Sequence, residues 1–212
     1  GYGWVGTSTG LKIFKPDKKE KIQFLHYKHV SGQASSLADN FIWRIYEDGS
    51  KNVWLTSINR MLDVIPFAAD RTQLHFLHAA PTIEKQLGLS ISSVDDFVID
   101  ANGNSWISIN GNGIWYGKLF IKDDKFFAEK GFHIMNDPRN SSSLADDMVW
   151  RIYCDSNGAI WCGTKKGVSV YDTYKEQFDA WGINRSKIFE EAISGTHIQT
   201  DQYNNTYIVS DN

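Results

Sequence analysis

The chain has no long apolar run and no long basic run. No stretch approaches the roughly 20 consecutive apolar residues of a membrane-spanning helix, so no membrane segment is expected. The most basic stretch, residues 17–21, is interrupted by acidic side chains, and the formal net charge is −3. Because binding a phosphate backbone requires a concentrated basic face, nucleic acid is not an expected partner.

Metal-ligating patterns are also scarce. The 6 histidines do not cluster in the sequence. Residues 100–104 and 155–158 resemble the start of a calcium loop, but the twelfth position, which would need a glutamate, holds Gly111 and Lys166. A side-chain cap on a hairpin turn explains the aspartates Asp100 and Asp155 better. We therefore expect neither a metal nor a cofactor.

The 2 cysteines, Cys154 and Cys162, flank a predicted hairpin. If Asn157 and Gly158 form its turn, Cys154 faces Trp161 and Cys162 faces Tyr153 across the strands. This register would put the two sulfurs on opposite faces of the sheet. The sequence thus predicts two free thiols, which are compatible with a reducing or an oxidising compartment.

Aromatic residues are abundant, at 14% of the chain with 8 Trp, and several of them recur at a fixed distance from an aspartate. The aspartate precedes a tryptophan or a tyrosine by six residues in the pairs Asp48–Trp54, Asp100–Trp106, Asp155–Trp161 and Asp201–Tyr207. Trp4 occupies the same position without its aspartate. A second duplication lies upstream, because residues 36–46 return as residues 143–153, with 93–100 as a weaker copy.

Each repeat is typical of four antiparallel strands, and a repeat of roughly this length is typical of a β-propeller blade. The fold class predicted is therefore all-β, a partial β-propeller of about four blades, with an all-β solenoid as the alternative. The predicted units are 1–40, 41–96, 97–147, 148–191 and a partial unit 192–212. A helical turn is expected only around residues 186–192. Because the chain begins and ends at the same point of the repeat, we expect a fragment of a larger propeller.

The repeats resemble the two-component regulator propeller repeat. Residues 143–172 carry the fullest set of matching positions, including Leu144, Trp150, Asp155, Trp161 and Tyr171. Residues 36–56 match well, although Leu55-Thr56-Ser57 stands where the usual Gly-Thr pair is expected. Residues 97–117 and 192–212 match more loosely.

This resemblance implies the sensor region of a hybrid two-component histidine kinase of Bacteroidetes. It implies a periplasmic propeller that senses a small molecule or an oligosaccharide and has no catalytic site of its own. The partners implied are the remaining blades of the same chain and, in the parent protein, a second copy. The kinase belongs to the parent and not to this segment.

The candidate ligand contacts lie on the innermost strands and on the loops at one face of the repeats. Because strand direction alternates, the loop before the first strand shares that face with the turn between the second and third strands. Aromatic rings beside polar groups suit sugars, which have an apolar face and a rim of hydroxyls. The predicted contacts are Trp43, Arg44, Asp96, Asp146, Asp147, Trp150, Arg151 and Lys165, with Asp39, Asn40, Asn59, Arg60, Asn110, Asn112 and Lys166 as further members of the same face.

Two other functions stay open from the sequence. An extracellular propeller enzyme acting on polysaccharide, such as a lyase, would need an acid or base converging with His197 near the channel. A scaffold that presents a protein-binding rim would need a contiguous exposed apolar patch.

Overall fold

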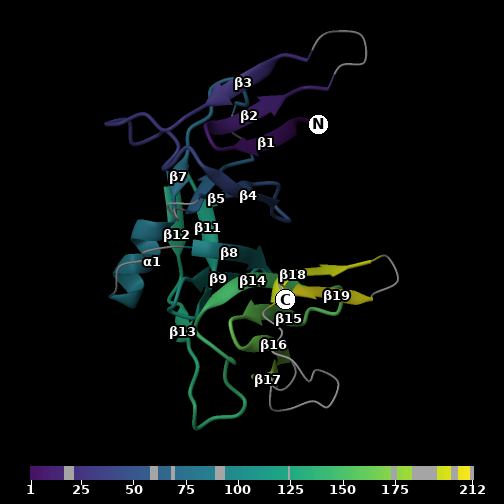
Figure 1. Ribbon diagram of the computed structural model, residues 1–212. Coiled ribbons are helices and arrows are strands. Elements are labelled where there is room, and N and C mark those ends of the chain that lie inside the picture. The colour runs from purple at the N-terminus through teal and green to yellow at the C-terminus, as the bar shows by residue number, and fades with distance from the viewer. Residues whose placement is uncertain are drawn as a thin grey trace. The chain divides into compact units, whose positions relative to one another are not determined.

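A computed structural model describes residues 1–16, 22–57, 62–67, 70–88, 94–123, 125–172, 176–182, 195–201 and 205–210. Its elements are antiparallel strands and one short helix (Figure 1). The chain divides into two compact units. Unit 1 comprises Gly1–Ser93 with Phe120–Phe127, and unit 2 comprises Val94–Leu119 with Ala128–Asn212.

Unit 1 holds two sheets in which sequential strands are neighbours. The first has the order β1-β2-β3 and the second β4-β5-β6-β7. The strands are β1 (Gly3–Thr7), β2 (Gly10–Phe14), β3 (Phe24–Tyr27), β4 (Ile42–Glu47), β5 (Val53–Ser57), β6 (Leu62–Ile65) and β7 (Leu77–His78). Both sheets contribute to one apolar core, which contains Leu11, Ile13, Leu37, Ile42, Val53, Leu55, Ile65 and Phe76.

Unit 2 holds two four-stranded sheets, with the orders β8-β9-β10-β13 and β14-β15-β16-β17, and a two-stranded hairpin of β18 and β19. The strands are β8 (Val94–Ile99), β9 (Ser105–Ile109), β10 (Ile114–Gly117), β13 (Phe132–Ile134), β14 (Val149–Cys154), β15 (Ile160–Thr164), β16 (Gly167–Asp172), β17 (Gln177–Gly182), β18 (Gly195–Thr200) and β19 (Thr206–Ser210). The core between the two four-stranded sheets contains Val98, Trp106, Ile114, Leu144, Val149, Ile152, Ile160, Cys162 and Phe178.

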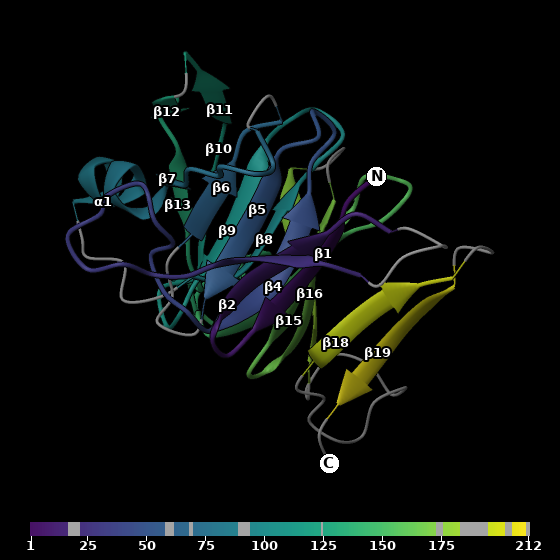
Figure 2. The same cartoon turned by 90° about the horizontal axis from the view of Figure 1, so that it is seen from above.

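Two elements were not expected from the sequence. A hairpin of β11 (Leu119–Lys122) and β12 (Lys125–Ala128) is inserted between β10 and β13. Helix α1 (Ala80–Leu87) follows directly after β7, at the outer edge of that sheet (Figure 2). The segment around 186–192, where a helical turn was expected, lies outside the described residues.

Helix α1 has recognisable ends but is too short to produce a periodic pattern. Pro81 lies in its first turn, and Gly88 ends it in the left-handed conformation with φ 67° while its N–H donates to the Glu84 carbonyl. Ala80 and Ile83 are buried. Because an isolated helix of this length is marginal in water, burial of this face stabilises it, and the sequence pattern alone does not predict it.

The repeated aspartates cap the hairpin turns, as predicted, and they also bind the repeated aromatic side chain. In the second sheet of unit 2, Asp155 Oδ1 accepts from the Asn157 and Ala159 amides and Oδ2 accepts from Trp161 Nε1 at 2.9 Å. The same bond joins Asp48 to Trp54 at 2.8 Å and Asp100 to Trp106 at 3.1 Å. In the β18–β19 hairpin the Tyr207 hydroxyl donates to Asp201 at 3.0 Å. The six-residue spacing is therefore the distance from the turn cap to the ring that it anchors.

Candidate ligand-binding loops

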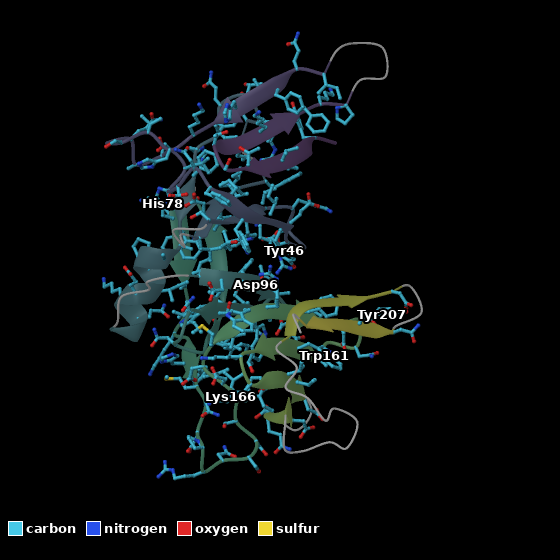
Figure 3. All side chains as sticks on the ribbon, viewed as in Figure 1. Tyr46, His78, Asp96, Trp161, Lys166 and Tyr207 are labelled. Carbon is cyan, nitrogen blue, oxygen red and sulfur yellow. The ribbon has the colours of Figure 1, made fainter. Side chains whose placement is uncertain are left out.

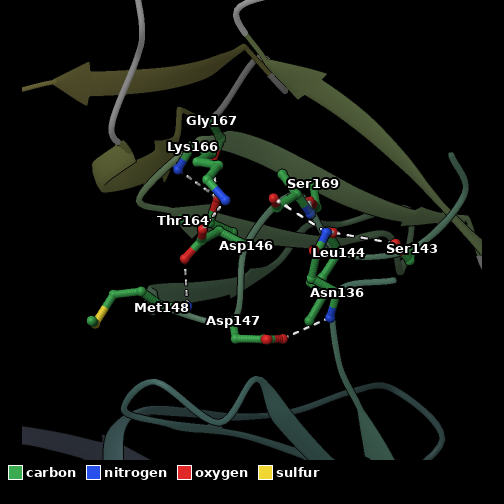
Figure 4. A network of polar contacts seen from close by, with 11 residues as sticks. Asn136, Ser143, Leu144, Asp146, Asp147, Met148, Thr164, Lys166, Gly167 and Ser169 are labelled. Carbon is green, nitrogen blue, oxygen red and sulfur yellow. Dashed lines mark hydrogen bonds and ion pairs between the residues drawn. The ribbon is translucent and has the colours of Figure 1, made fainter. Parts of the chain in front are cut away.

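The loop before β14 and the turn between β15 and β16 lie together, as the alternation of strand direction predicts (Figure 4). The Lys166 ammonium lies 2.9 Å from Asp146 Oδ2, and Asp146 Oδ1 accepts the Met148 amide at 2.9 Å. The Lys165 amide donates to the Met148 carbonyl at 3.0 Å. These bonds bring Asp146 and Lys165, two of the predicted contacts, to one place.

The pKa values of the Asp146–Lys166 pair reflect this contact. Partial burial raises the pKa of Asp146, but the bonds from Lys166 and from the Met148 amide outweigh it, so the net pKa lies below its ordinary value. The hydrogen bond to Asp146 raises the pKa of Lys166. Both groups are therefore charged at neutral pH. Asp146 is thus paired with Lys166, whereas the side chain of the neighbouring Lys165 is exposed.

Asp147 acts mainly on the loop itself. Its Oδ1 accepts the Asn136 amide at 2.6 Å, and its carbonyl accepts the Gly113 amide at 2.8 Å. The Asn136 side-chain amide donates to the Leu144 carbonyl. Asp147 therefore holds together the loop before β14, the segment before it and the turn between β9 and β10.

Unit 1 contains the same loop in front of β4. Asp39 Oδ1 accepts the Phe41 amide at 2.7 Å, as Asp146 does for Met148. Asn40 accepts the His29 amide at 2.8 Å, in the place of Asp147. The duplicated sequence thus encodes one loop conformation, built by short polar side chains that bind nearby amides.

In β4, β8 and β14 the second residue of the strand is the extra residue of a bulge. In β4, Ile42 pairs with Ser57 and Arg44 with Thr56, so that Trp43 is the extra residue. Trp150 is the extra residue of β14, and Asp95 that of β8. A bulge redirects a side chain away from the regular alternation. Trp43 is accordingly 54% exposed, and Trp150 is partly exposed.

A sequence signal for the bulge exists but was missed. Ile42 and Ile45 are three residues apart and yet belong to the same core, as do Val149 and Ile152 in unit 2. In a regular strand residues three apart point to opposite faces. Apolar residues at this spacing therefore indicate an extra residue between them.

The position after the bulge holds Arg44, Arg151 and Asp96, and these three predicted contacts differ in their surroundings. Arg44 and Arg151 are partly exposed, and an Arg151 guanidinium nitrogen donates to the Trp150 carbonyl at 3.1 Å. Asp96 lies on β8 (Figure 3), and it is fully buried. Its Oδ1 accepts the Phe97 amide at 2.8 Å, and its Oδ2 accepts the Ile152 amide of β14 at 2.9 Å. Asp96 thus joins two neighbouring sheets, and we leave it out of the candidate site.

Of the further polar residues on this face, Asn110 and Asn112 lie in the turn between β9 and β10, and Asn59 and Arg60 lie outside the described residues. Asn110 Nδ2 is 3.5 Å from Asp95 Oδ1. The side chain of His197, the residue on which a catalytic reading would depend, is also outside the described part of the structure.

A repeated histidine was not recognised from the sequence. His26, His78 and His133 take equivalent register positions on the outermost strands β3, β7 and β13. His26 Nε2 lies 3.0 Å from the Thr9 carbonyl in the turn before β2, and His133 Nε2 lies 2.6 Å from the Asn112 carbonyl in the turn before β10. Their distances from Trp4, Trp54 and Trp106 are similar, and this spacing is the signal that was available.

The predicted register of the two cysteines is wrong by one residue. Tyr153 pairs with Trp161, so Cys162 faces Ile152 and Cys154 faces Ile160. The turn contains one residue more than a two-residue loop, because Asp155 N–H bonds to the Ala159 carbonyl. Both sulfurs therefore lie on the same face of the sheet, as diagonal neighbours. Both thiols are free, and burial raises the pKa of each.

Within the described ranges, no three His, Cys, Asp or Glu side chains come together as a metal site. The helix among these residues is neither long nor apolar enough to span a bilayer.

Known proteins share parts of this sequence and its fold. The family described as "Two component regulator propeller" matches residues 36–59 and 143–166, the two segments that contain the duplicated loop, the bulge and the capped hairpin. No curated protein matches the chain at a significant level.

Solved structures share the fold. The extracellular domain of the hybrid two component system BT3049 from B. thetaiotaomicron aligns over 99% of this chain with a TM-score of 0.67 and 21% identity. That of BT4673 from the same organism aligns over 99% with a TM-score of 0.65 and 16% identity. PorZ, a surface component of the type-IX secretion system of Porphyromonas gingivalis, aligns over 98% with a TM-score of 0.64 and 15% identity. The chain spans 25%, 27% and 29% of those three chains, respectively, so its fold is that of part of a β-propeller.

Proposed function

Since the chain carries two component regulator propeller repeats, we propose that it is part of the ligand-sensing propeller of a hybrid two-component signalling protein. The location proposed is the periplasm, and the remaining blades belong to the same parent chain. The observation that carries the proposal is the coincidence of the family's two matches with the two loops that lead into a bulged tryptophan, Trp43 in one and Trp150 in the other.

The ligand proposed is an oligosaccharide, bound without chemistry. Trp43 and Trp150 leave the core at bulges, and each is followed by an arginine. A tryptophan ring offers an apolar plate for a sugar face, and the adjoining cation offers donors for hydroxyls or for an acidic substituent. In unit 2 the exposed Lys165 adds a further donor near the same loop.

The capped loops explain how such a plate would be kept in place. Asp146 and Asp147 each accept a backbone amide of the loop or of the segment before it. Their counterparts Asp39 and Asn40 do the same in unit 1. In the proposal these four residues are positioning residues rather than ligand contacts. A preorganised loop loses little conformational entropy when a ligand binds, which favours affinity.

The test is a binding measurement on the Trp150→Ala variant. The chain would be titrated calorimetrically with oligosaccharides released by partial acid hydrolysis of plant and fungal polysaccharides. For a fraction that binds, Trp150→Ala should weaken the affinity by roughly tenfold or more, because the loss of an aromatic contact is worth about 1–3 kcal/mol. The same substitution at Trp43 tests the loop of unit 1.

Phe132→Ala provides the matched control. Phe132 is 65% exposed but lies on the outermost strand β13, so its removal should leave the affinity unchanged. Equal affinity of the wild-type and Trp150→Ala chains would exclude the tryptophan plate. Shortened products after prolonged incubation with the binding fraction would instead favour an enzyme.

A further inference from the structure

His78 lies on β7 (Figure 3), and its ring contacts two hydrogen-bond acceptors. Its Nδ1 lies 2.6 Å from Asp63 Oδ1 on β6, and its Nε2 lies 2.8 Å from the Ala34 carbonyl oxygen. A neutral imidazole carries one N–H and therefore can donate to only one of these two oxygens. Both contacts are satisfied together only when the ring is a doubly protonated imidazolium.

The acceptor on β6 is a carboxylate that the fold has removed from solvent. Asp63 is 2% exposed, and its second oxygen, Oδ2, accepts the Ala38 amide at 2.9 Å. A buried carboxylate is stable when it is paired with a cation and fully hydrogen-bonded. His78 supplies the cation, while 30% of its side chain stays exposed, so that it exchanges protons with the solvent.

The charged groups around the ring favour its protonation. The hydrogen bond that His78 donates to Asp63 raises the pKa of His78 above the ordinary value of 6.5, and partial burial opposes this rise without cancelling it. The Ala34 carbonyl, in the segment 34–38, also forms a hydrogen bond with the ring and raises the pKa of His78. The next carboxylate along the chain is Asp39, which accepts the Phe41 amide.

In unit 2 the contact equivalent to the one between Ala38 and Asp63 contains no charged group. There the Ala145 amide donates to Ser169 Oγ at 2.9 Å, in the place of the bond from Ala38 to Asp63. The strand partner of Ser169 is Ala180, whereas the partner of Asp63 is His78. The loops dock similarly in both units, since the Phe76 amide donates to the Ser35 carbonyl at 3.0 Å and the Phe178 amide to the Ser142 carbonyl at 3.1 Å. The charged pair is thus not required for this loop conformation.

We propose that Asp63 and His78 form a protonation-dependent clamp on residues 34–38, the segment that leads into β4 and Trp43. With His78 protonated, the ring binds Asp63 and Ala34 at once. When the ring has lost one proton, one of its two nitrogens presents a lone pair to the oxygen that it faces. The two lone pairs repel each other, and that side of the clamp opens. The segment of unit 1 therefore loosens as pH rises, whereas the uncharged equivalent in unit 2 does not respond.

The direction of the pH effect follows from linkage. Because the folded pKa of His78 is raised, its contribution to stability is complete below about pH 6.5, the pKa in the unfolded chain, and is lost as pH rises through the folded pKa. The clamp is thus closed in mildly acidic solution and opens on the alkaline side.

The experiment is an NMR titration of the whole chain from about pH 6 up to the pH at which the His78 ring has lost its second proton. At the lower pH the His78 ring should show protons on both Nδ1 and Nε2. Hydrogen-exchange protection of the Phe76 amide, divided by that of the Phe178 amide, should fall by roughly fivefold at the higher pH. The ratio uses the matched bond of unit 2 as an internal control.

The double variant Asp63→Ser with His78→Ala copies the residue pair of the unit 2 loop. It should fold and keep a constant Phe76 to Phe178 protection ratio over this range. A His78 ring with one proton at about pH 6, or a wild-type ratio that does not change with pH, would overturn the clamp. A double variant with the same pH response as the wild type would overturn it as well. None of these readouts depends on the ligand.

Discussion

Replacing Asp100 by alanine should lower the free energy of unfolding of unit 2 by about 3–5 kcal/mol. Asp100 Oδ1 accepts the Asn102 and Asn104 amides at 2.9 and 2.8 Å. Its Oδ2 accepts the Asn104 side-chain amide and Trp106 Nε1, both at 3.1 Å. Alanine removes all four acceptor contacts from a turn that connects two core strands.

The indole is the reason that the expected loss is large. Trp106 is 1% exposed and packs against Tyr116 in its own sheet and Tyr171 in the next, with ring centroids 4.3 and 4.9 Å away. Without Asp100 its buried N–H loses this acceptor, and an unsatisfied buried donor costs about 1–3 kcal/mol by itself. The loss of the turn bonds adds to this cost.

Urea denaturation followed by tryptophan fluorescence would measure the effect, with Asp201→Ala as the control. Asp201 makes the same kind of contacts, to the Asn205 amides and the Tyr207 hydroxyl, but in an exposed hairpin where Tyr207 is 55% exposed. Water can replace the lost partner there, so the loss should be much smaller. Equal losses in the two variants would show that the buried indole bond does not carry the effect.

Replacing Gly131 by alanine should cost about 3 kcal/mol of the free energy of unfolding, at the upper end of the usual range for overpacking a core. A Cβ at this position would lie 2.2 Å from Trp115 Nε1 and 2.3 Å from Trp115 Cε2. Trp115 is fully buried, so its ring has little space into which to move. Either the indole or the backbone before β13 must shift.

Gly49→Ala is the matched control, because no atom lies within 4 Å of a Cβ there and its φ is outside the left-handed region. Its midpoint of denaturation should equal that of the wild type within error. If Gly131→Ala were equally neutral, the close packing of the backbone against Trp115 would not exist in solution.

The repeat could be read from the sequence because local chemistry repeats with it. An aspartate that caps a turn needs only the hairpin itself, and the bonds that Asp48, Asp100 and Asp155 accept from turn amides confirm this prediction. The bond from each aspartate to the ring six residues later was not predicted, although the spacing was noted. The packing of a repeated tryptophan between neighbouring sheets is confirmed for Trp106. The match to the two component regulator propeller falls on the two best copies of the pattern.

The sequence alone did not distinguish ligand contacts from structural residues. Asp96, Arg44 and Arg151 share one strand position, and as sequence symbols all three are polar. Only the approach of β14, whose Ile152 amide binds Asp96 at 2.9 Å, turns that carboxylate into a contact between sheets. The register error at Cys154 has a similar origin, because one extra turn residue exchanges the faces of a whole strand.

The sequence by itself determined the class of fold, the repeat and the capped hairpins, since these depend on residues close together in the chain. The tertiary structure decided which of the repeated polar side chains are buried, how far Trp43 and Trp150 are exposed, and that His78 contacts both Asp63 and Ala34. The physical reason is the distance along the chain. Asp63 and His78 are 15 residues apart and His78 and Ala34 are 44 apart, and no local spacing specifies contacts between segments that only the packed sheet brings together.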